Sequence, residues 1–196
     1  GDEATEEMVD MILEAAASFS EDVIAPLYQS GDEGCRFENG NVYTPKGFKE
    51  AYKQYVEGGW QSMATPVEYG GQGLPISLAL AKSEMIGTAN WSWGMYPGLS
   101  LGAMNTIWMH GTEAQKREYF VPLSDGRWMG TMCLTEPQCG TDLGQVKTKA
   151  EPNGDGSYNL TGTKIFISSG DHDLTENIIH IVLARLPGAP EGTRGI

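Results

Sequence analysis

Apolar side chains recur every three or four positions through most of the first 125 residues, a spacing typical of helices that bury one face. A helix is predicted over residues 5–27, ending or kinking at Pro26, because proline removes a helical hydrogen bond. Residues 30–45 are rich in glycine and asparagine and predict a surface loop. Thr112 and Gln115 have the spacing of a capping box, so a short helix is expected to begin there. The remaining predicted helices cover residues 45–57, 75–88 and 98–110.

Near Asp125 the helical spacing gives way to short segments in which apolar and polar residues alternate. Residues 146–150 have the period of two that is typical of a strand with one buried face, and Pro152 to Gly156 has the composition of a turn. Other strands are expected over residues 128–135, 158–160, 164–168 and 178–186. The predicted fold class is α+β. A helical N-terminal domain (residues 1–125) is followed by part of an antiparallel β-barrel or sheet domain (residues 126–196).

The charge balance argues against several classes of partner. The chain has 26 acidic and 13 Lys or Arg residues, a formal net charge of −13, which makes nucleic acid and anionic membranes unfavourable partners. No apolar run approaches the ~20 residues that a membrane-spanning helix needs. The three cysteines are scattered and do not form a disulfide framework, so we expect a reducing, cytoplasmic location.

One segment combines features of a binding loop. Residues 131–142 leave a predicted strand and enter a loop that contains a glycine and several hydroxyl groups. Backbone N–H groups and hydroxyls in such a loop suit the electron-rich edge of a ligand. The same pattern is also compatible with an irregular strand exit that binds nothing, so the residues alone leave both interpretations open.

The residues of this loop, Leu-Thr-Glu-Pro-x-x-Gly-Thr-Asp over 134–142, resemble the signature of the acyl-CoA dehydrogenase family. Three further segments resemble other segments of that family in the same order along the chain. They are residues 59–73, 110–116 and 162–170. The loops over 30–35 and 171–177 resemble the 3-methylthiopropionyl-CoA dehydrogenase-like branch. The resemblance covers roughly residues 9–196.

The resemblance implies a flavoprotein that holds FAD and oxidises an acyl-CoA thioester to its 2,3-enoyl form. It implies that Thr135 faces the pyrimidine edge of the flavin and that Thr141 contacts the thioester arm of the substrate. Phe166 and Ser168 stand where the family most often has Trp and Thr, on what is expected to be a second flavin-contacting strand. The residues implied to bind the cofactor are Met132, Leu134, Thr135, Gly140, Thr141, Phe166, Ile167 and Ser168.

For the substrate, the resemblance implies an acyl pocket formed in part by the helical domain. The candidates are Met95, Tyr96 and Leu99, together with Thr141. A methionine thioether is soft and polarisable and suits a sulfur-bearing acyl chain, although these residues are equally compatible with core packing. An electron-transfer flavoprotein is the implied partner, and the longer protein is expected to form homo-oligomers.

No glutamate of this sequence matches the context of the family's catalytic base, which comes from a C-terminal helical domain. We therefore expect the chain to be a fragment that lacks this domain, carries no catalytic residue and is inactive alone. Asp171-His172-Asp173 is expected to be a solvated loop, with no metal site, and His180 a hydrogen-bonded core residue. Three alternatives stay open: an acyl-CoA oxidase, a DNA-binding flavoprotein of the same fold, and a module that has lost its flavin.

Overall fold

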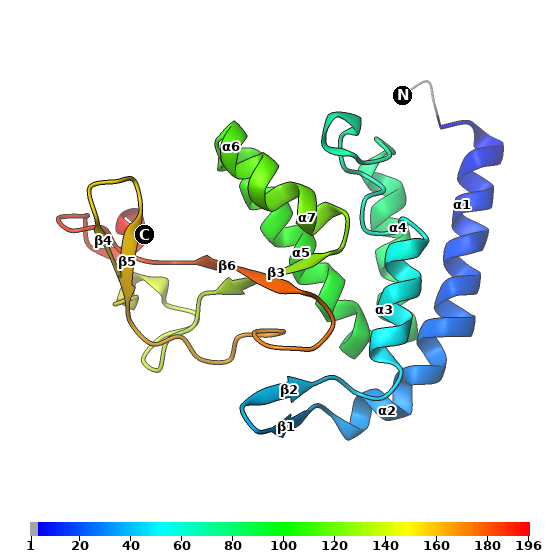
Figure 1. Ribbon diagram of the computed structural model, residues 1–196, viewed down its shortest axis with the longest axis horizontal. Helices are drawn as coiled ribbons and strands as arrows, with labels where there is room; N and C mark the ends of the chain where they lie inside the picture. Colours follow the sequence, from blue (N-terminus) through cyan, green and yellow to red (C-terminus); the bar gives the residue numbers. More distant parts are fainter. Residues whose placement is uncertain (1–3) are drawn as a thin grey trace. The chain divides into compact units, whose positions relative to one another are not determined.

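The computed structural model describes residues 4–196, which divide into two compact units (Figure 1). The first unit comprises the chain up to Gly130 together with Asp171–Ile179, and the second comprises Thr131–Gly170 and His180–Ile196. The two units do not coincide with the predicted domains, residues 1–125 and 126–196, because residues 171–179 belong to the first unit. The predicted domain boundary stays a prediction.

The first unit is built from helices. They are α1 (Glu6–Phe19), η1 (Ser20–Ile24), η2 (Ala25–Leu27), α2 (Tyr28–Glu33), α3 (Phe48–Glu57), η3 (Val67–Tyr69), α4 (Ile76–Ala89), α5 (Trp91–His110), α6 (Glu113–Gln115), η4 (Lys116–Phe120) and α7 (Val121–Ser124). The predicted capping box is confirmed, since the Thr112 side chain accepts from the Gln115 N–H and the Gln115 side chain accepts from the Thr112 N–H. The first predicted helix is also confirmed, with a change to π and then 3-10 geometry before and around Pro26.

Aromatic residues form the centre of the helical core. Trp93, Tyr55 and Phe48 are almost completely buried, and the Trp93 indole N–H donates to the Phe48 carbonyl oxygen at 3.2 Å. The Tyr55 and Trp93 rings meet edge to face with centroids 5.5 Å apart, and Phe19 packs against both. Such pairs add specific geometry to the burial of large apolar surfaces, so this core fixes how α1, α3 and α5 pack.

The structure corrects the sequence prediction at two places in this unit. Residues 30–45 do not form a loop throughout, because β1 (Arg36–Glu38) and β2 (Asn41–Tyr43) pair as an antiparallel hairpin. Its turn is Asn39-Gly40, both at positive φ, the combination that a tight two-residue hairpin turn requires. Helix α5 begins at Trp91 rather than Gly98, because Asn90 caps it by accepting from the Trp93 N–H, and the helix continues through Pro97.

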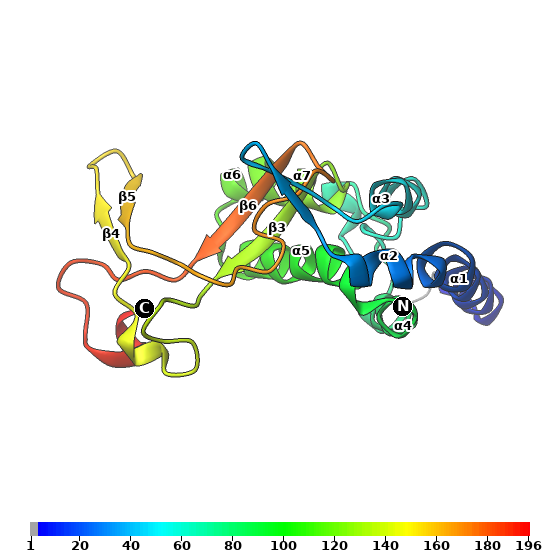
Figure 2. The same ribbon diagram turned by 90° about the horizontal axis from the view of Figure 1, so that it is seen from below.

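Two strand pairs make up the sheet region (Figure 2). As predicted, β4 (Lys149–Pro152) and β5 (Tyr158–Thr161) form an antiparallel hairpin. In contrast, β3 (Trp128–Cys133) and β6 (Asn177–Val182) run parallel. The Glu176 N–H donates to the Arg127 carbonyl, and the Leu183 N–H donates to the Cys133 carbonyl. The expected sheet is therefore antiparallel only in part.

The strand expected over residues 164–168 is absent from the structure, where residues 162–167 have no regular secondary structure. Phe166 has a φ of 54° and Ser169 a φ of 56°, and this left-handed backbone conformation interrupts an extended strand. Within residues 4–196 we find no helix that is both long and apolar enough to cross a membrane.

Candidate functional site

The loop that follows β3 is organised around one buried carboxylate. Glu136 is 4% exposed and accepts five hydrogen bonds. One oxygen accepts from the N–H and hydroxyl of Thr148, at 3.0 and 2.6 Å, and from the Lys164 ammonium at 2.9 Å. The other accepts from the Lys147 N–H at 2.8 Å and the Gln138 amide at 2.6 Å. A single side chain therefore ties the loop to two other segments of the second unit.

These bonds determine the charge state of the carboxylate. Burial alone would raise the pKa of Glu136, but the hydrogen bonds from Thr148, Lys147 and Lys164 outweigh it and hold the pKa well below its usual range. Glu136 therefore remains ionised at neutral pH. A buried carboxylate whose oxygens are all satisfied in this way is a rigid anchor rather than a group that exchanges protons.

Two of the predicted flavin-contacting segments are brought together by this anchor. Besides its bond to Glu136, the Lys164 ammonium donates to the Leu134 carbonyl at 3.0 Å, and the Ile165 N–H donates to the Thr135 carbonyl at 2.9 Å. A methyl group added at Gly140 would lie 3.3 Å from Thr135 Cγ2, so glycine allows the loop to close on itself. The loop and residues 164–166 thus form one frame.

The side chains on this frame are unusually accessible. Phe166 is 87% exposed and Met132 is 38% exposed, whereas apolar residues of this size are normally buried. Thr141 and Ser168 are exposed, and Leu134, Thr135 and Ile167 are half-buried. An exposed aromatic ring and exposed hydroxyl groups on the same frame suit a flat ligand with an apolar face and a polar edge, and an isoalloxazine ring has both features.

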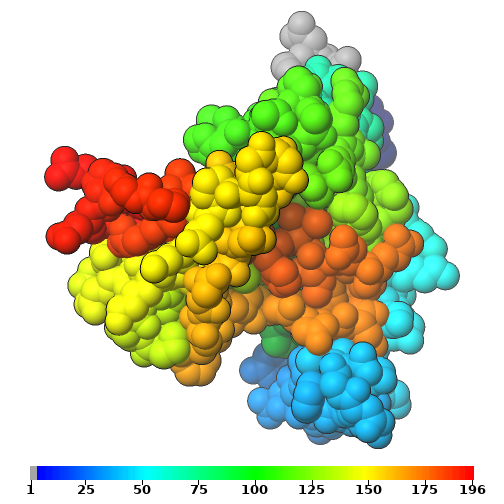
Figure 3. Space-filling model, turned by 60° about the vertical axis from the view of Figure 1, so that its left-hand side comes forward, coloured from blue at the N-terminus to red at the C-terminus, as the bar shows by residue number. Residues whose placement is uncertain are grey.

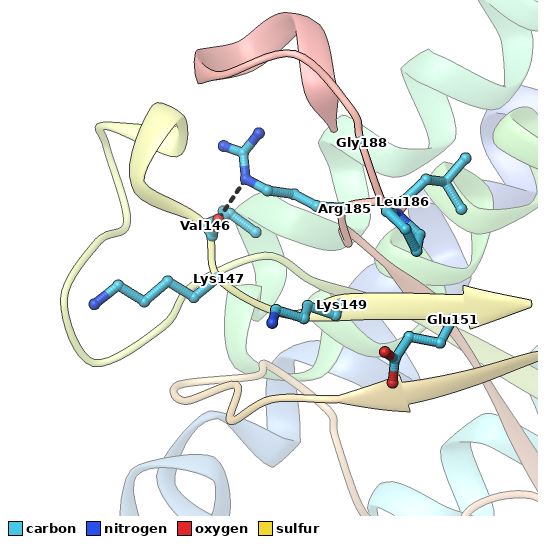
Figure 4. Close-up of a pocket in the computed structure, with 8 residues that line it drawn as sticks. Val146, Lys147, Lys149, Glu151, Arg185, Leu186 and Gly188 are labelled. Carbon is cyan, nitrogen blue, oxygen red and sulfur yellow. Dashed lines mark hydrogen bonds between the residues drawn. The ribbon is translucent and has the colours of Figure 1, made fainter.

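A basic hollow of about 520 Å³ lies elsewhere in the same unit (Figure 4). Three basic residues and one acidic residue line it together with Leu186, namely Lys147, Lys149, Arg185 and Glu151. The Arg185 guanidinium donates to the carbonyls of Val146, Gly144 and Gly192, none of which neutralises its charge. Figure 3 shows the β4–β5 hairpin (yellow) at the surface beside the C-terminal residues (red). The hollow is suited to an anionic group, and the sequence prediction did not include it.

The predicted acyl-pocket residues have different environments within the helical unit. Met95 and Leu99 line a hollow of about 520 Å³ between α4 and α5. Tyr96 belongs instead to the core, where its hydroxyl contacts the Cys35 thiol at 3.4 Å and its ring meets the His172 ring edge to face at 5.5 Å. Burial raises the pKa of Tyr96 above its usual range. The structure places Met95 and Leu99 together and separates Tyr96 from them.

Two histidines differ from expectation. His172 is 7% exposed and therefore not solvated, and Asp173 next to it accepts from the N–H and hydroxyl of Thr44. His180 is hydrogen-bonded as predicted, with Nδ1 2.6 Å from the Thr131 hydroxyl, but it is exposed. No cluster of metal-ligating side chains occurs in the part of the chain that the structure describes.

Sequence reasoning missed the role of Glu136 and the burial of Lys82. The hydrogen bonds of Glu136 come from residues up to 28 positions away along the chain, so no local pattern reveals them. Lys82 was detectable, because it shares the helical spacing of Leu78 and Ile86, two buried apolar residues of α4.

Comparisons with known proteins agree with this architecture. The N-terminal domain model of acyl-CoA dehydrogenases matches residues 6–127. The chain is 51% identical over 185 residues to a 3-methylmercaptopropionyl-CoA dehydrogenase of Ruegeria pomeroyi, covering 94% of this chain and 32% of that protein. Thus the chain spans about a third of the length of that relative.

Solved structures of acyl-CoA dehydrogenases are also similar to this chain. The butyryl-CoA dehydrogenase of Megasphaera elsdenii is 28% identical, with a TM-score of 0.76, over 98% of this chain and 46% of that one. An acyl-CoA dehydrogenase of Bacillus anthracis complexed with FAD is 26% identical, with a TM-score of 0.72, over 95% of this chain and 30% of that one. The order of motifs, the helical unit and these matches together show that the chain belongs to the acyl-CoA dehydrogenase family.

Proposed function

We propose that this chain forms part of an FAD-dependent acyl-CoA dehydrogenase and supplies much of its flavin-binding surface. The observation that carries the proposal is the frame anchored by Glu136, which joins the 134–142 loop to residues 164–166. In this frame Phe166 is exposed and directly follows Ile165, whose N–H donates to the Thr135 carbonyl. When bound, FAD would supply the hydride acceptor for oxidation of an acyl thioester to its 2,3-enoyl form.

In this proposal each side chain has a limited task. Thr135 would donate a hydrogen bond to the pyrimidine edge of the flavin, where reduction concentrates negative charge. Phe166 and Met132 would contact apolar parts of the ring, Thr141 would offer its hydroxyl group to the substrate arm, and Ser168 would offer its hydroxyl group to the flavin. Leu134, Gly140 and Ile167 complete the flavin surface. No residue of this chain is assigned as the catalytic base.

Apolar and basic residues are proposed to contact different parts of the acyl-CoA substrate. Met95 and Leu99 are proposed to contact the acyl chain, whereas Tyr96 supports them from the core. Lys147 and Lys149 in the basic hollow are proposed to attract the phosphate groups of CoA. A cytoplasmic location, transfer of electrons to an electron-transfer flavoprotein and homo-oligomerisation belong to the same proposal.

The substrate class is proposed to be a short, sulfur-bearing acyl group, as in the relative from Ruegeria pomeroyi. The test is the visible spectrum of the purified, intact protein that contains this chain, before and after anaerobic addition of 3-methylthiopropionyl-CoA. A flavin spectrum that bleaches supports the proposal. A flavin spectrum that bleaches only with butyryl-CoA retains the reaction and refutes the substrate, and the absence of flavin after incubation with FAD refutes the cofactor assignment.

A further inference from the structure

The side-chain amide of Asn90 is buried with part of its hydrogen-bonding capacity unused. Asn90 is 2% exposed, and its Oδ1 accepts from the Ser92 hydroxyl at 2.6 Å and from the Trp93 N–H at 3.2 Å. Its Nδ2 carries two donor hydrogens and has no hydrogen-bond partner among residues 4–196. Leaving a buried donor unpaired is costly, so this amide calls for an acceptor that the chain itself does not supply.

Asn90 belongs to the wall of a hollow at the N-terminal end of α5. The hollow has a volume of about 250 Å³, which suits a small ligand, since drug-sized ligands occupy about 300–1,000 Å³. A methyl group added at Gly31 of α2 would lie 3.6 Å from Asn90 Nδ2 and 2.5 Å from the Ser92 hydroxyl oxygen. The amide therefore faces space that this glycine leaves open. The residues that line the hollow are Tyr28, Gly31, Asp32, Asn90, Trp91 and Ser92.

The α5 side of the hollow carries further hydrogen-bond donors. Trp91 and Ser92 are the first two residues of α5, a helix of 20 residues. The N–H groups at the start of a helix have no acceptor within it, and the aligned peptide dipoles place partial positive charge there. The Ser92 side chain is exposed. A carboxylate at this end of the helix would satisfy these donors together with the Asn90 amide.

The α2 side of the hollow has the opposite electrostatic character. Asp32 lines the hollow, and its carboxylate has no ion-pair partner among residues 4–196. The rings of Tyr28 and Trp91, which are 70% and 66% exposed, line the same hollow. Aromatic faces next to a carboxylate attract organic ammonium ions, and quaternary ammonium groups above all. This side therefore suits a cation.

From these two sides we infer that the hollow binds a small zwitterion, in which a carboxylate and a quaternary ammonium group are separated by only a few bonds. The carboxylate of the ligand accepts from Asn90 Nδ2 and from the N-terminal end of α5. Its ammonium group lies against the aromatic rings and Asp32. A simple anion would be repelled by Asp32, and a simple cation would leave Asn90 unpaired, so neither uses both sides.

The inference is independent of the proposed function. Every residue that it uses lies in the helical unit, and none is assigned to FAD or to acyl-CoA. Of the residues that line this hollow, Trp91 also lines the one that contains Met95 and Leu99, and the other five do not. The zwitterion site would stand if the protein bound no flavin, and its failure would leave the dehydrogenase proposal unchanged.

The test is calorimetric titration of the intact protein with glycine betaine and two analogues of nearly the same size. The first analogue, 3,3-dimethylbutanoate, keeps the shape and the carboxylate but has no positive charge. The second, choline, keeps the quaternary ammonium group and lacks the carboxylate. We expect saturable binding of glycine betaine, at least about tenfold tighter than that of either analogue.

Two variants at Asn90 and Asn105 test the amide directly. Asn90→Asp keeps the Oδ1 acceptor that caps α5, so the helix should stay intact, but it replaces both amide donors by a negative charge. Asn105→Asp introduces the same charge at an exposed position of the same helix. We expect Asn90→Asp to weaken glycine betaine binding at least about tenfold and Asn105→Asp to leave it unchanged.

A variant on the α2 side guards against a folding defect at the buried position. Asp32 is exposed, so Asp32→Asn should fold normally, weaken glycine betaine binding about fivefold and leave 3,3-dimethylbutanoate binding no weaker. Absence of saturable glycine betaine binding to wild type would overturn the inference. Equal affinity for glycine betaine and 3,3-dimethylbutanoate would also overturn it, because the helix end would then accept any carboxylate. Equal glycine betaine affinity in wild type and Asn90→Asp would do the same.

Discussion

The two units differ in the partner that each provides for the ammonium group of a lysine with little solvent exposure. In the sheet unit, Lys164 is paired with Glu136 at 2.9 Å and also donates to a backbone carbonyl. In the helical unit, Lys82 has as its partner the hydroxyl of Tyr55, a residue of the aromatic core. The first lysine is part of a satisfied polar network, whereas burial lowers the pKa of the second to about 8. One buried ammonium therefore has an anion as its partner and the other does not.

The other buried residues of the two units also differ in polarity. The helical core is filled by large aromatic and aliphatic side chains. In the second unit the buried residues are mostly small or polar, and they include Thr131, Glu136, Thr148 and Val146. Hydrogen bonds therefore contribute more to the stability of the sheet unit. Its free energy of unfolding should fall more when one hydrogen-bonding partner is removed.

The largest effect is expected from Glu136→Gln. It leaves the Lys164 ammonium buried without its anion and should destabilise the sheet unit by about 3–5 kcal/mol in urea denaturation. Glu151→Gln, a change of an exposed carboxylate on β4, is the matched control and should be nearly neutral. A loss no larger than that of the control would contradict the role given to Glu136.

The same carboxylate predicts a pH dependence. Because the pKa of Glu136 lies below its ordinary value of 4.5 in the folded state, its stabilisation is complete above that pH. It is lost as the pH falls from 4.5 toward the folded pKa. Urea titrations at a series of acidic pH values should show this loss in wild type and not in Glu136→Gln.

Lys82→Met should have the next largest effect and the opposite sign. Removing an uncompensated buried charge is expected to stabilise the helical unit by about 2 kcal/mol at neutral pH. The gain should shrink between pH 8 and 10.5, because in that range unfolded lysine binds more protons than folded Lys82. Lys53→Met serves as control, and a destabilised Lys82→Met would show that the Tyr55 contact outweighs the cost of burial.

The substitution Phe166→Ala tests an exposed residue of the sheet unit that is proposed to bind FAD without contributing to stability. Since the ring is 87% exposed, the variant should unfold at the same denaturant concentration as wild type. Its dissociation constant for FAD, followed by flavin fluorescence, should rise about tenfold through loss of aromatic contact. Phe37→Ala removes a ring that is 75% exposed on β1 and should leave FAD binding unchanged. Equal effects of the two changes would remove Phe166 from the flavin surface.

The smallest effect is expected from the double change Lys147→Gln and Lys149→Gln. Exposed charges contribute little to stability, so only the KM for acyl-CoA should change, rising about threefold with a weaker dependence on salt. The control changes Lys49 and Lys53, two exposed lysines of α3, to glutamine. If both pairs shift KM alike, the effect reflects net charge rather than the hollow.

Local patterns predicted most of the helices, because their apolar spacing and caps are short-range features. The hairpin over 36–43 was also encoded locally, by Asn39-Gly40, but the surrounding glycines suggested a loop. The start of α5 was missed since Pro97 and its neighbouring glycines disfavour a helix that tertiary packing nevertheless stabilises.

The site was predictable only in part. Motif resemblance named Thr135 and Phe166, and the structure places their segments in contact. It could not reveal Glu136 as the anchor, because its partners Thr148 and Lys164 lie 12 and 28 residues away along the chain. The parallel pairing of β3 and β6 was missed for the same reason, since alternation in sequence carries no information about strand direction.

The return of residues 171–179 to the helical unit has a consequence for how the protein is made. Asp173 binds Thr44 across 129 positions of sequence, and Leu174 completes the aromatic core. During synthesis the helices emerge before these residues do, so the core of the helical unit stays incomplete until Leu174 has left the ribosome. Translation speed through the intervening strands therefore determines how long that apolar surface is exposed to chaperones and to other nascent chains.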